Sequence, residues 1–166
     1  MGSSYLRFDK DSPEYQAIVA WWRELDSRRG ERAILRRCRN LTEVAFSPSY
    51  HHLRLTISRL GSVNDERLAL IAAILAHVKA DIEGGSIAEQ MATGKTDGTT
   101  RVSGLRFRRL LKVKEQDELF RAMIRMIALL GSGCNLQSLV QSLYFWNDEM
   151  RKRWAFDYYS KSPNEK

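Results

Sequence analysis

Helical periodicity is the feature that most constrains this chain. Apolar residues recur at intervals of three and four along most of its 166 residues, and no run alternates apolar and polar residues as a half-buried strand would. Only three prolines are present, and two of them stand at expected helix starts, in Ser12-Pro13 and Ser47-Pro48. The sequence therefore predicts an all-α fold.

One helix is expected at the centre of this fold. An apolar line runs from Leu68 to Val78, and Leu70 and Ile74 widen it. A helix that is apolar over so much of its circumference has to be covered on several sides. Asn64 or Asp65 is a candidate N-cap for it, and Ser12, Ser47, Ser103 and Asn135 are candidates for other helices.

The composition changes between Ile82 and Gly104, where five glycines occur with serines and threonines between them. Residues 86–91 are expected to form one or two helical turns, and residues 92–100 an exposed loop. The sequence therefore predicts two small helical bundles joined by a loop that contains Gly, Ser and Thr. The predicted units are an N-terminal bundle at 1–83, a linker at 84–104 and a C-terminal bundle at 105–166.

The chain has a formal net charge of +7, and arginine dominates the positive residues. Such an excess indicates an anionic partner, most often nucleic acid. The densest stretch, Arg101 to Lys114, has six positive side chains and no negative one. Phe107, Leu110 and Leu111 have helical spacing within it, and Ser103 precedes it as an N-cap. We expect a short helix that packs through Phe and Leu and exposes cations.

Helical geometry predicts the faces of these cations. Arg106 and Arg109 are expected on one side of the helix, and Arg108 and Lys112 on the other. A second basic ridge is expected on a helix at residues 31–40, and it includes Arg32, Arg36 and Arg37. On a helix from about residue 117 to 130, Arg121 and Arg125 share a face, and Asp117 is placed to pair with Arg121. Each ridge could also be a solvated face without a partner.

Other chemistry lacks support in the sequence. Gly94-Lys95-Thr96 resembles the end of a phosphate-binding loop, but Glu89 stands where that motif needs glycine. His51 and His52 are adjacent, so on a helix they point in different directions, and two cysteines are too few for a cysteine-based zinc site. We therefore expect no catalytic residue, cofactor or metal. No apolar run could span a bilayer, which indicates a cytoplasmic protein without a membrane partner.

Trp21 lies off the apolar stripe of its helix. It is therefore the best candidate among the tryptophans for an exposed or interface aromatic.

Three signatures in order resemble a known family. Trp21 to Leu25 with Gly30 to Arg37 looks like the N-terminal signature of the small subunit of type I-E Cascade, the CRISPR antiviral surveillance complex (CasB/Cse2 family). Val102 to Leu111 is similar to the central signature of that family. The closing segments Trp146-Asn147-Asp148, Arg153-Trp154-Ala155 and Tyr158-Tyr159 also fit.

The resemblance implies a non-enzymatic, all-helical subunit that is present in two copies within the complex. The implied neighbours are the crRNA-bearing backbone subunits and the large subunit. The implied role is to hold the opened R-loop, particularly the displaced DNA strand, on a basic surface. Arg36, Arg37, Arg106 and Arg109 lie within the matching signatures, whereas Arg32, Arg108, Arg121 and Arg125 rest mainly on their predicted faces.

Two other functions stay open. The chain could be a protein–protein scaffold whose basic faces dock acidic partner subunits. It could also be a helical nuclease that uses Asp65 and Glu66 or His51 and His52.

Overall fold

The structure, a computed structural model, describes residues 5–166, and this part of the chain has ten helices and two strands of two residues each. The all-α prediction is confirmed. The helices are α1 (Pro13–Glu24), α2 (Arg29–Arg37), α3 (Leu41–Ala45), α4 (Pro48–Ser58), α5 (Asp65–Leu75), α6 (Ile87–Ala92), α7 (Gly104–Leu111), α8 (Gln116–Leu129), α9 (Leu136–Tyr144) and α10 (Asp148–Lys161). The strands are β1 (Ala80–Asp81) and β2 (Gly133–Cys134).

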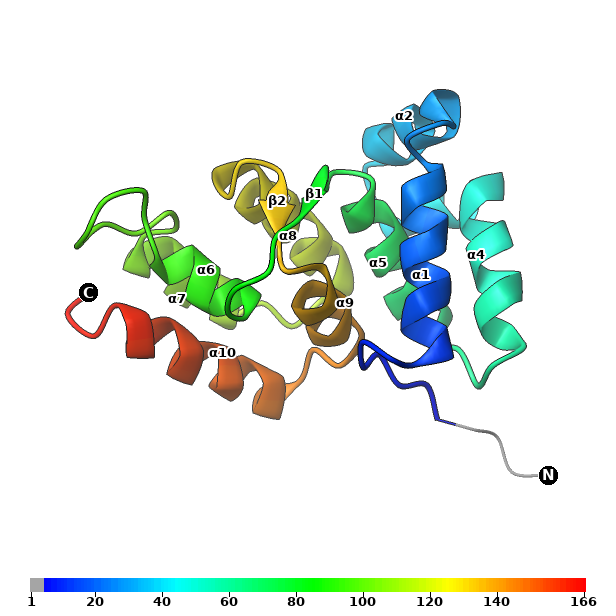
Figure 1. Cartoon of the computed structure of the whole chain (residues 1–166). Helices are drawn as coiled ribbons and strands as arrows, with labels where there is room; N and C mark the ends of the chain where they lie inside the picture. Colours follow the sequence, from blue (N-terminus) through cyan, green and yellow to red (C-terminus); the bar gives the residue numbers. More distant parts are fainter. Residues whose placement is uncertain (1–4) are drawn as a thin grey trace.

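Helix α5 is the centre of the fold, as predicted. Every side chain from Leu68 to Leu75 is buried, and so is Val78 just beyond the helix. Helices α2, α3 and α4 pack against α5 from the first half of the chain, and α8 and α9 pack against it from the second half (Figure 1). An apolar helix is stable in this position because neighbours cover it on all sides.

Contacts after α5 join the two halves of the chain. Strands β1 and β2 pair in parallel, with Ala80 opposite Gly133 and Asp81 opposite Cys134, a pairing that the helical periodicity did not predict. The Asp81 carboxylate also accepts a hydrogen bond from the Leu136 N–H, at the start of α9, at 3.0 Å. Buried residues from both halves belong to one core cluster.

The predicted linker at 84–104 contributes to that core through α6. The buried side chains of α6 include Ile87 and Met91, and the helix packs along α10 (Figure 1). Residues 93–100 form neither helix nor strand. The division into bundles at 1–83 and 105–166 stays a prediction, and residues 1–4 of the first bundle lie outside the described residues.

Helix starts follow the predicted caps. In each case a side-chain oxygen accepts a backbone N–H from the first turn of the helix. The confirmed caps are Ser12, Ser47, Asn64, Ser103 and Asn135.

One helix and one tryptophan differ from the prediction. The helix expected at residues 31–40 spans Arg29–Arg37, and a separate helix, α3, begins at Leu41. Trp21 was expected to be exposed, but only 8% of it is exposed, and its Nε1–H donates to the Ser49 carbonyl at 2.9 Å. The expectation was wrong because α1 packs on α4 as well, so α1 has a second buried face.

Candidate nucleic-acid interface

Helix α7 carries a dense positive charge, and contacts outside the helix hold it in place. Ser103 caps its start by accepting the Arg106 N–H at 3.3 Å. The Phe107 ring stacks on the Tyr158 ring of α10, with centroids 4.0 Å apart and planes 9° from parallel. Repulsion between like charges costs about 0.2–0.5 kcal/mol per pair. Burial of an aromatic ring contributes about 1.5–3 kcal/mol, so the packing of Phe107 outweighs the repulsion between neighbouring arginines.

The end of α7 is anchored by side chains from the C-terminal part of the chain. The Arg151 guanidinium donates to the Leu111 carbonyl at 2.9 Å. The Trp146 indole donates to the Val113 carbonyl at 2.9 Å. The bond from Arg151 satisfies a carbonyl that the end of α7 leaves open. Both bonds hold the turn between α7 and α8 in place.

A groove of about 760 Å³ lies between α7 and α8. Four exposed cations line it: Arg106 and Arg109 of α7, Lys112 at the end of α7, and Arg125 of α8. Glu118 is the one carboxylate among the described lining residues. The remaining lining residues are apolar: Leu110, Val113, Ala122, Met126, Ala128 and Leu129. Within residues 5–166, none of the four cations forms a salt bridge, so their charges can act on an anion from outside.

The groove gathers cations that the sequence assigned to different places. It joins the predicted pair Arg106 and Arg109 with Arg125 of a separate helix. Lys112 was predicted on the same side as Arg108, but it lines the groove with Arg106 and Arg109. The reason is that α7 ends at Leu111, so Lys112 occupies the C-cap position and its flexible side chain reaches the groove from there. Arg108 does not line the groove and is half-buried. Leu110, on the expected apolar face of α7, lines the groove, but the groove also depends on apolar residues of α8 that the sequence did not single out.

Helix α2 supplies a second group of cations. Arg36 and Arg37 are exposed, and no salt bridge engages them within the described chain. Arg32 was also expected to face solvent, but its side chain is only 17% exposed. The expectation was wrong because the end of α5 lies over this position. The Arg32 guanidinium donates to the carbonyls of Ala76 and Val78, each at 3.0 Å, and thereby caps α5.

Asp117 connects the two basic regions. Its carboxylate accepts the Leu41 N–H at 2.8 Å, which places the start of α8 beside the start of α3 and therefore close to the end of α2. The predicted ion pair between Asp117 and Arg121 is absent from the described structure, where Arg121 is exposed. Asp117, Arg121 and Arg125 follow each other at intervals of four, so they form a row along α8 from the α3 side to the groove.

His77 lies beneath the α2 ridge. Its Nε2 atom is buried and no described group hydrogen-bonds to it. Burial lowers the pKa of His77 to about 4, and the nearby charges of Arg36 and Arg32 act in the same direction. The imidazole is therefore neutral at neutral pH.

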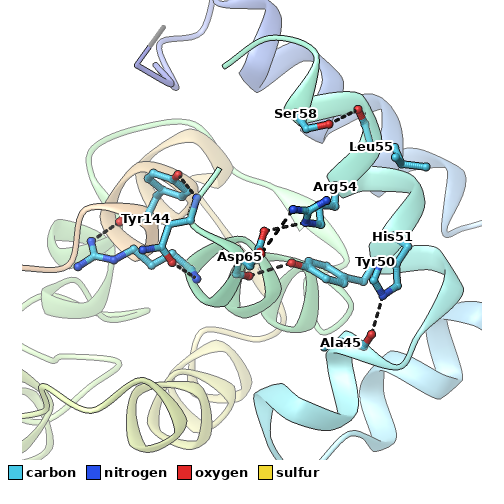
Figure 2. A network of polar contacts seen from close by, with 10 residues as sticks. Ala45, Tyr50, His51, Arg54, Leu55, Ser58, Asp65 and Tyr144 are labelled. Carbon is cyan, nitrogen blue, oxygen red and sulfur yellow. Dashed lines mark hydrogen bonds and ion pairs between the residues drawn. The ribbon is translucent and has the colours of Figure 1, made fainter. Parts of the chain in front are cut away.

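Asp65 and His51, two residues of the nuclease alternative, contact different neighbours (Figure 2). The Asp65 carboxylate accepts the Arg54 Nε–H at 2.7 Å, and the Tyr50 hydroxyl donates to the Asp65 backbone carbonyl at 2.9 Å. His51 Nε2 lies 2.6 Å from the Ala45 carbonyl oxygen. These bonds connect α4 to α5 and to the end of α3, so each side chain has a structural role.

Three further features of the chain bear on its chemistry. The Gly94 N–H donates to the Thr99 carbonyl at 2.8 Å, and the next helix starts only at Gly104, so this segment does not lead directly into a helix as a phosphate-binding loop does. Among residues 5–166, no three His, Cys, Asp or Glu side chains are grouped as metal ligands. None of the helices described here has the length and apolar character needed to cross a membrane.

The fold matches solved structures over most of their lengths. A chain in the crystal structure of E. coli Cascade bound to a PAM-containing dsDNA target (32-nt spacer) matches with a TM-score of 0.71 at 15% identity, and the match covers 90% of this chain and 97% of that chain. CasB from Thermus thermophilus matches with a TM-score of 0.66 at 22% identity, over 90% and 99% of the two chains. A second structure from Thermus thermophilus, of a CRISPR-associated protein of the Cse2 family, has the same TM-score and coverage at 23% identity. No curated protein matches the sequence.

The family is shown by the sequence itself. The model of the family described as CRISPR-associated protein Cse2 matches residues 31–159, which is most of the chain. The match includes nearly all of α2, both helices of the groove and most of α10. The resemblance to the small-subunit family is thereby confirmed, and this chain belongs to the CRISPR-associated Cse2 family.

Proposed function

We propose that this chain is a non-catalytic subunit of a type I-E Cascade complex and that it stabilises the opened target by holding nucleic acid on a basic track. The partners are the other Cascade subunits, a second copy of the chain, and either the displaced DNA strand or the duplex of crRNA with its target. The observation that carries the proposal is the α7–α8 groove, with four exposed cations that have no salt-bridge partner in residues 5–166. The match to a chain of E. coli Cascade bound to dsDNA supports it.

The track runs from α2 to the groove. Arg36 and Arg37 stand at one end and the groove cations at the other, with Arg121 on α8 between them. The bond between Asp117 and Leu41 supports this continuity because it holds α8 against the α2–α3 junction. Arg108, half-buried beside the groove, is at the margin of the track. Arg32 is left out because its guanidinium holds α5.

A track of this kind can stabilise an opened duplex without reading its sequence. Opening the target exchanges one duplex for another of similar stability, so contacts to the nucleic-acid backbone can shift the balance. Each arginine that neutralises a phosphate releases counterions, which makes binding dependent on salt. We expect the isolated chain to bind DNA weakly and without sequence preference, with a Kd of about 1 μM or weaker at physiological salt.

The salt dependence of DNA binding tests the track. In the Arg36→Ala/Arg109→Ala variant, the slope of log K against log salt should decrease by about 1.5–2, because two phosphate contacts are lost. The matched control is Arg23→Ala/Arg59→Ala, which removes the same charge from two exposed positions at the ends of α1 and α4. A slope equal to wild type in the Arg36/Arg109 variant contradicts the track.

The same variant separates the track from the scaffold alternative. Within the assembled complex, the track predicts that guide RNA binding stays intact while the opened target becomes less stable. A scaffold that docks acidic partner subunits predicts that the variant subunit leaves the complex while DNA binding by the free chain is unchanged. Subunit retention and DNA affinity should therefore be measured on the same preparations.

The absence of catalysis is tested separately. We expect the purified chain to leave labelled DNA, RNA and nucleoside triphosphates intact in the presence of magnesium or manganese. Metal-dependent cleavage that disappears in Asp65→Ala or His51→Ala would overturn this expectation and support the nuclease alternative.

A further inference from the structure

The groove between α7 and α8 has a character that phosphate binding alone does not explain. Its rim is cationic, but most of its described lining residues are apolar. We infer that this groove receives an unpaired nucleobase, so that the chain prefers single-stranded nucleic acid to duplex. The inference rests on the proposed nucleic-acid track and assigns a ligand to one point of it.

The rim and the floor of the groove fit different parts of a nucleotide. Arg106 and Arg109 on one wall and Arg125 on the other are exposed and available for phosphates. The lining also includes Met126 and Leu129 of α8, and Leu129 is 38% exposed although it is apolar. A phosphate cannot cover apolar surface, whereas the face of a base can.

The groove is large enough for this purpose. Its volume of about 760 Å³ lies within the range of sites that hold small ligands. Arginine planes stack on unpaired bases, and a flexible methionine adapts its shape to the ring that it contacts. In a duplex the base faces are stacked on each other, so only an unpaired base can present its face to this floor.

The apolar floor, rather than the arginines, favours nucleic acid over an acidic peptide, because a guanidinium pairs with a carboxylate as well as with a phosphate. The guanidinium fork matches the geometry of a phosphate, and both walls can contact successive phosphates of one strand while the base between them enters the groove. An acidic peptide also satisfies the charges. It has no planar ring for the floor, and this difference can be tested.

The experiment compares ligands with equal phosphates and different bases. The full chain is titrated with labelled oligothymidylate, with an abasic strand of the same length, and with duplex of the same length, all at one salt concentration. We expect oligothymidylate to bind about three- to tenfold more tightly than the abasic strand, which corresponds to the weak end of base-stacking contributions. Polyglutamate should compete less well than oligothymidylate at equal charge.

Variants of the floor identify the groove as the cause. Leu129→Ser removes the exposed apolar surface, and Ala122→Phe fills the groove. Both should lower the affinity for oligothymidylate to that for the abasic strand and leave the salt slope unchanged. Leu105→Ser is the control, because Leu105 is an exposed apolar residue of α7 that does not line the groove. Since Leu129 lies at the end of α8 and is partly exposed, this variant is informative even if Ala122→Phe does not fold.

Two results overturn the inference. One is equal affinity of wild type for oligothymidylate and the abasic strand, and the other is equal competition by polyglutamate. If the first occurs while Arg109→Ala still decreases the salt slope, the phosphate track stands and only the base site fails. If the salt slope of Arg109→Ala is also that of wild type, the proposed function itself fails.

Discussion

The Asp117 carboxylate accepts a hydrogen bond from the Leu41 backbone N–H at 2.8 Å, although 76 positions separate the two residues in the sequence. Leu41 is the first residue of α3, and its N–H is one of the donors that the start of a helix leaves without an internal partner. The bond therefore completes α3 and positions α8, the helix that carries Arg121 and Arg125.

Replacing Asp117 should destabilise the fold. The Asp117→Ala variant leaves the partly buried Leu41 N–H without its charged acceptor, which costs about 1–3 kcal/mol of unfolding free energy. Urea denaturation followed by circular dichroism measures this loss. Glu118→Ala is a matched control because it removes the same charge from the next position in the first turn of α8. An equal loss in both variants contradicts the role of the Leu41 bond.

Replacing Glu118 should strengthen DNA binding. Glu118 is the only carboxylate among the described residues that line the groove, so its charge repels phosphates there. At about 4–6 Å in water this repulsion is worth somewhat less than about 1 kcal/mol. The Glu118→Ala variant should therefore bind about two- to fivefold more tightly at low salt. The gain should disappear in high salt, and fluorescence anisotropy at two salt concentrations tests both statements.

Arg32 and Arg36 should differ in what they contribute, although both belong to α2. Arg32→Ala removes hydrogen bonds to two carbonyls at the end of α5, so it should lower the unfolding free energy by about 2 kcal/mol or more. Arg36 is exposed, so Arg36→Ala should change stability by less than about 0.5 kcal/mol. In DNA binding the order is reversed, and only Arg36→Ala should decrease the salt slope. Stability loss in Arg36→Ala equal to that in Arg32→Ala would contradict this division.

His77 should make the protein sensitive to mild acid. Its pKa is about 4 in the folded chain and about 6.5 when unperturbed, so between these values the unfolded chain binds more protons than the folded chain. The stability that neutral His77 supports is fully present above about pH 6.5 and decreases as the pH falls towards 4. Unfolding free energies across this window should show a smaller pH dependence in His77→Gln than in wild type. His52→Gln, at an exposed position, is the control and should keep the wild-type dependence.

The two cysteines should differ in reactivity. Burial, with a smaller effect from Asp81, raises the pKa of Cys134 to about 12, and the side chain is fully buried. Cys38 is only partly buried, and burial and, to a smaller extent, Glu43 raise its pKa. Because the thiolate is the reactive species, a thiol reagent should modify Cys38 in the folded protein and Cys134 only after unfolding. Rapid labelling of Cys134 in a folded Cys38→Ser variant would show that the core around α9 opens readily.

Local signals in the sequence were sufficient for most helices and for the starts that have side-chain caps, whereas α3 was not predicted and α2 spans Arg29–Arg37 instead of residues 31–40. Ser12, Ser47 and Ser103 are caps in the structure as predicted, because a cap bonds to the backbone only a few residues away. The apolar circumference of α5 likewise placed that helix at the centre, since no other position covers all its faces. The family followed from signatures whose order along the chain is a property of the sequence alone.

Only the tertiary structure decided which side chains are free to act. Arg32 and Arg36 lie one turn apart on α2, and helical periodicity treats them alike, but in the described structure only Arg32 donates hydrogen bonds to carbonyls at the end of α5. Trp21 is buried because α4 covers a second face of α1. The groove needs residues of both α7 and α8, and Trp146 and Arg151 help to hold the turn between these helices from elsewhere in the chain. A sequence shows which face of a helix a residue occupies, whereas contacts between distant segments determine whether that face is covered.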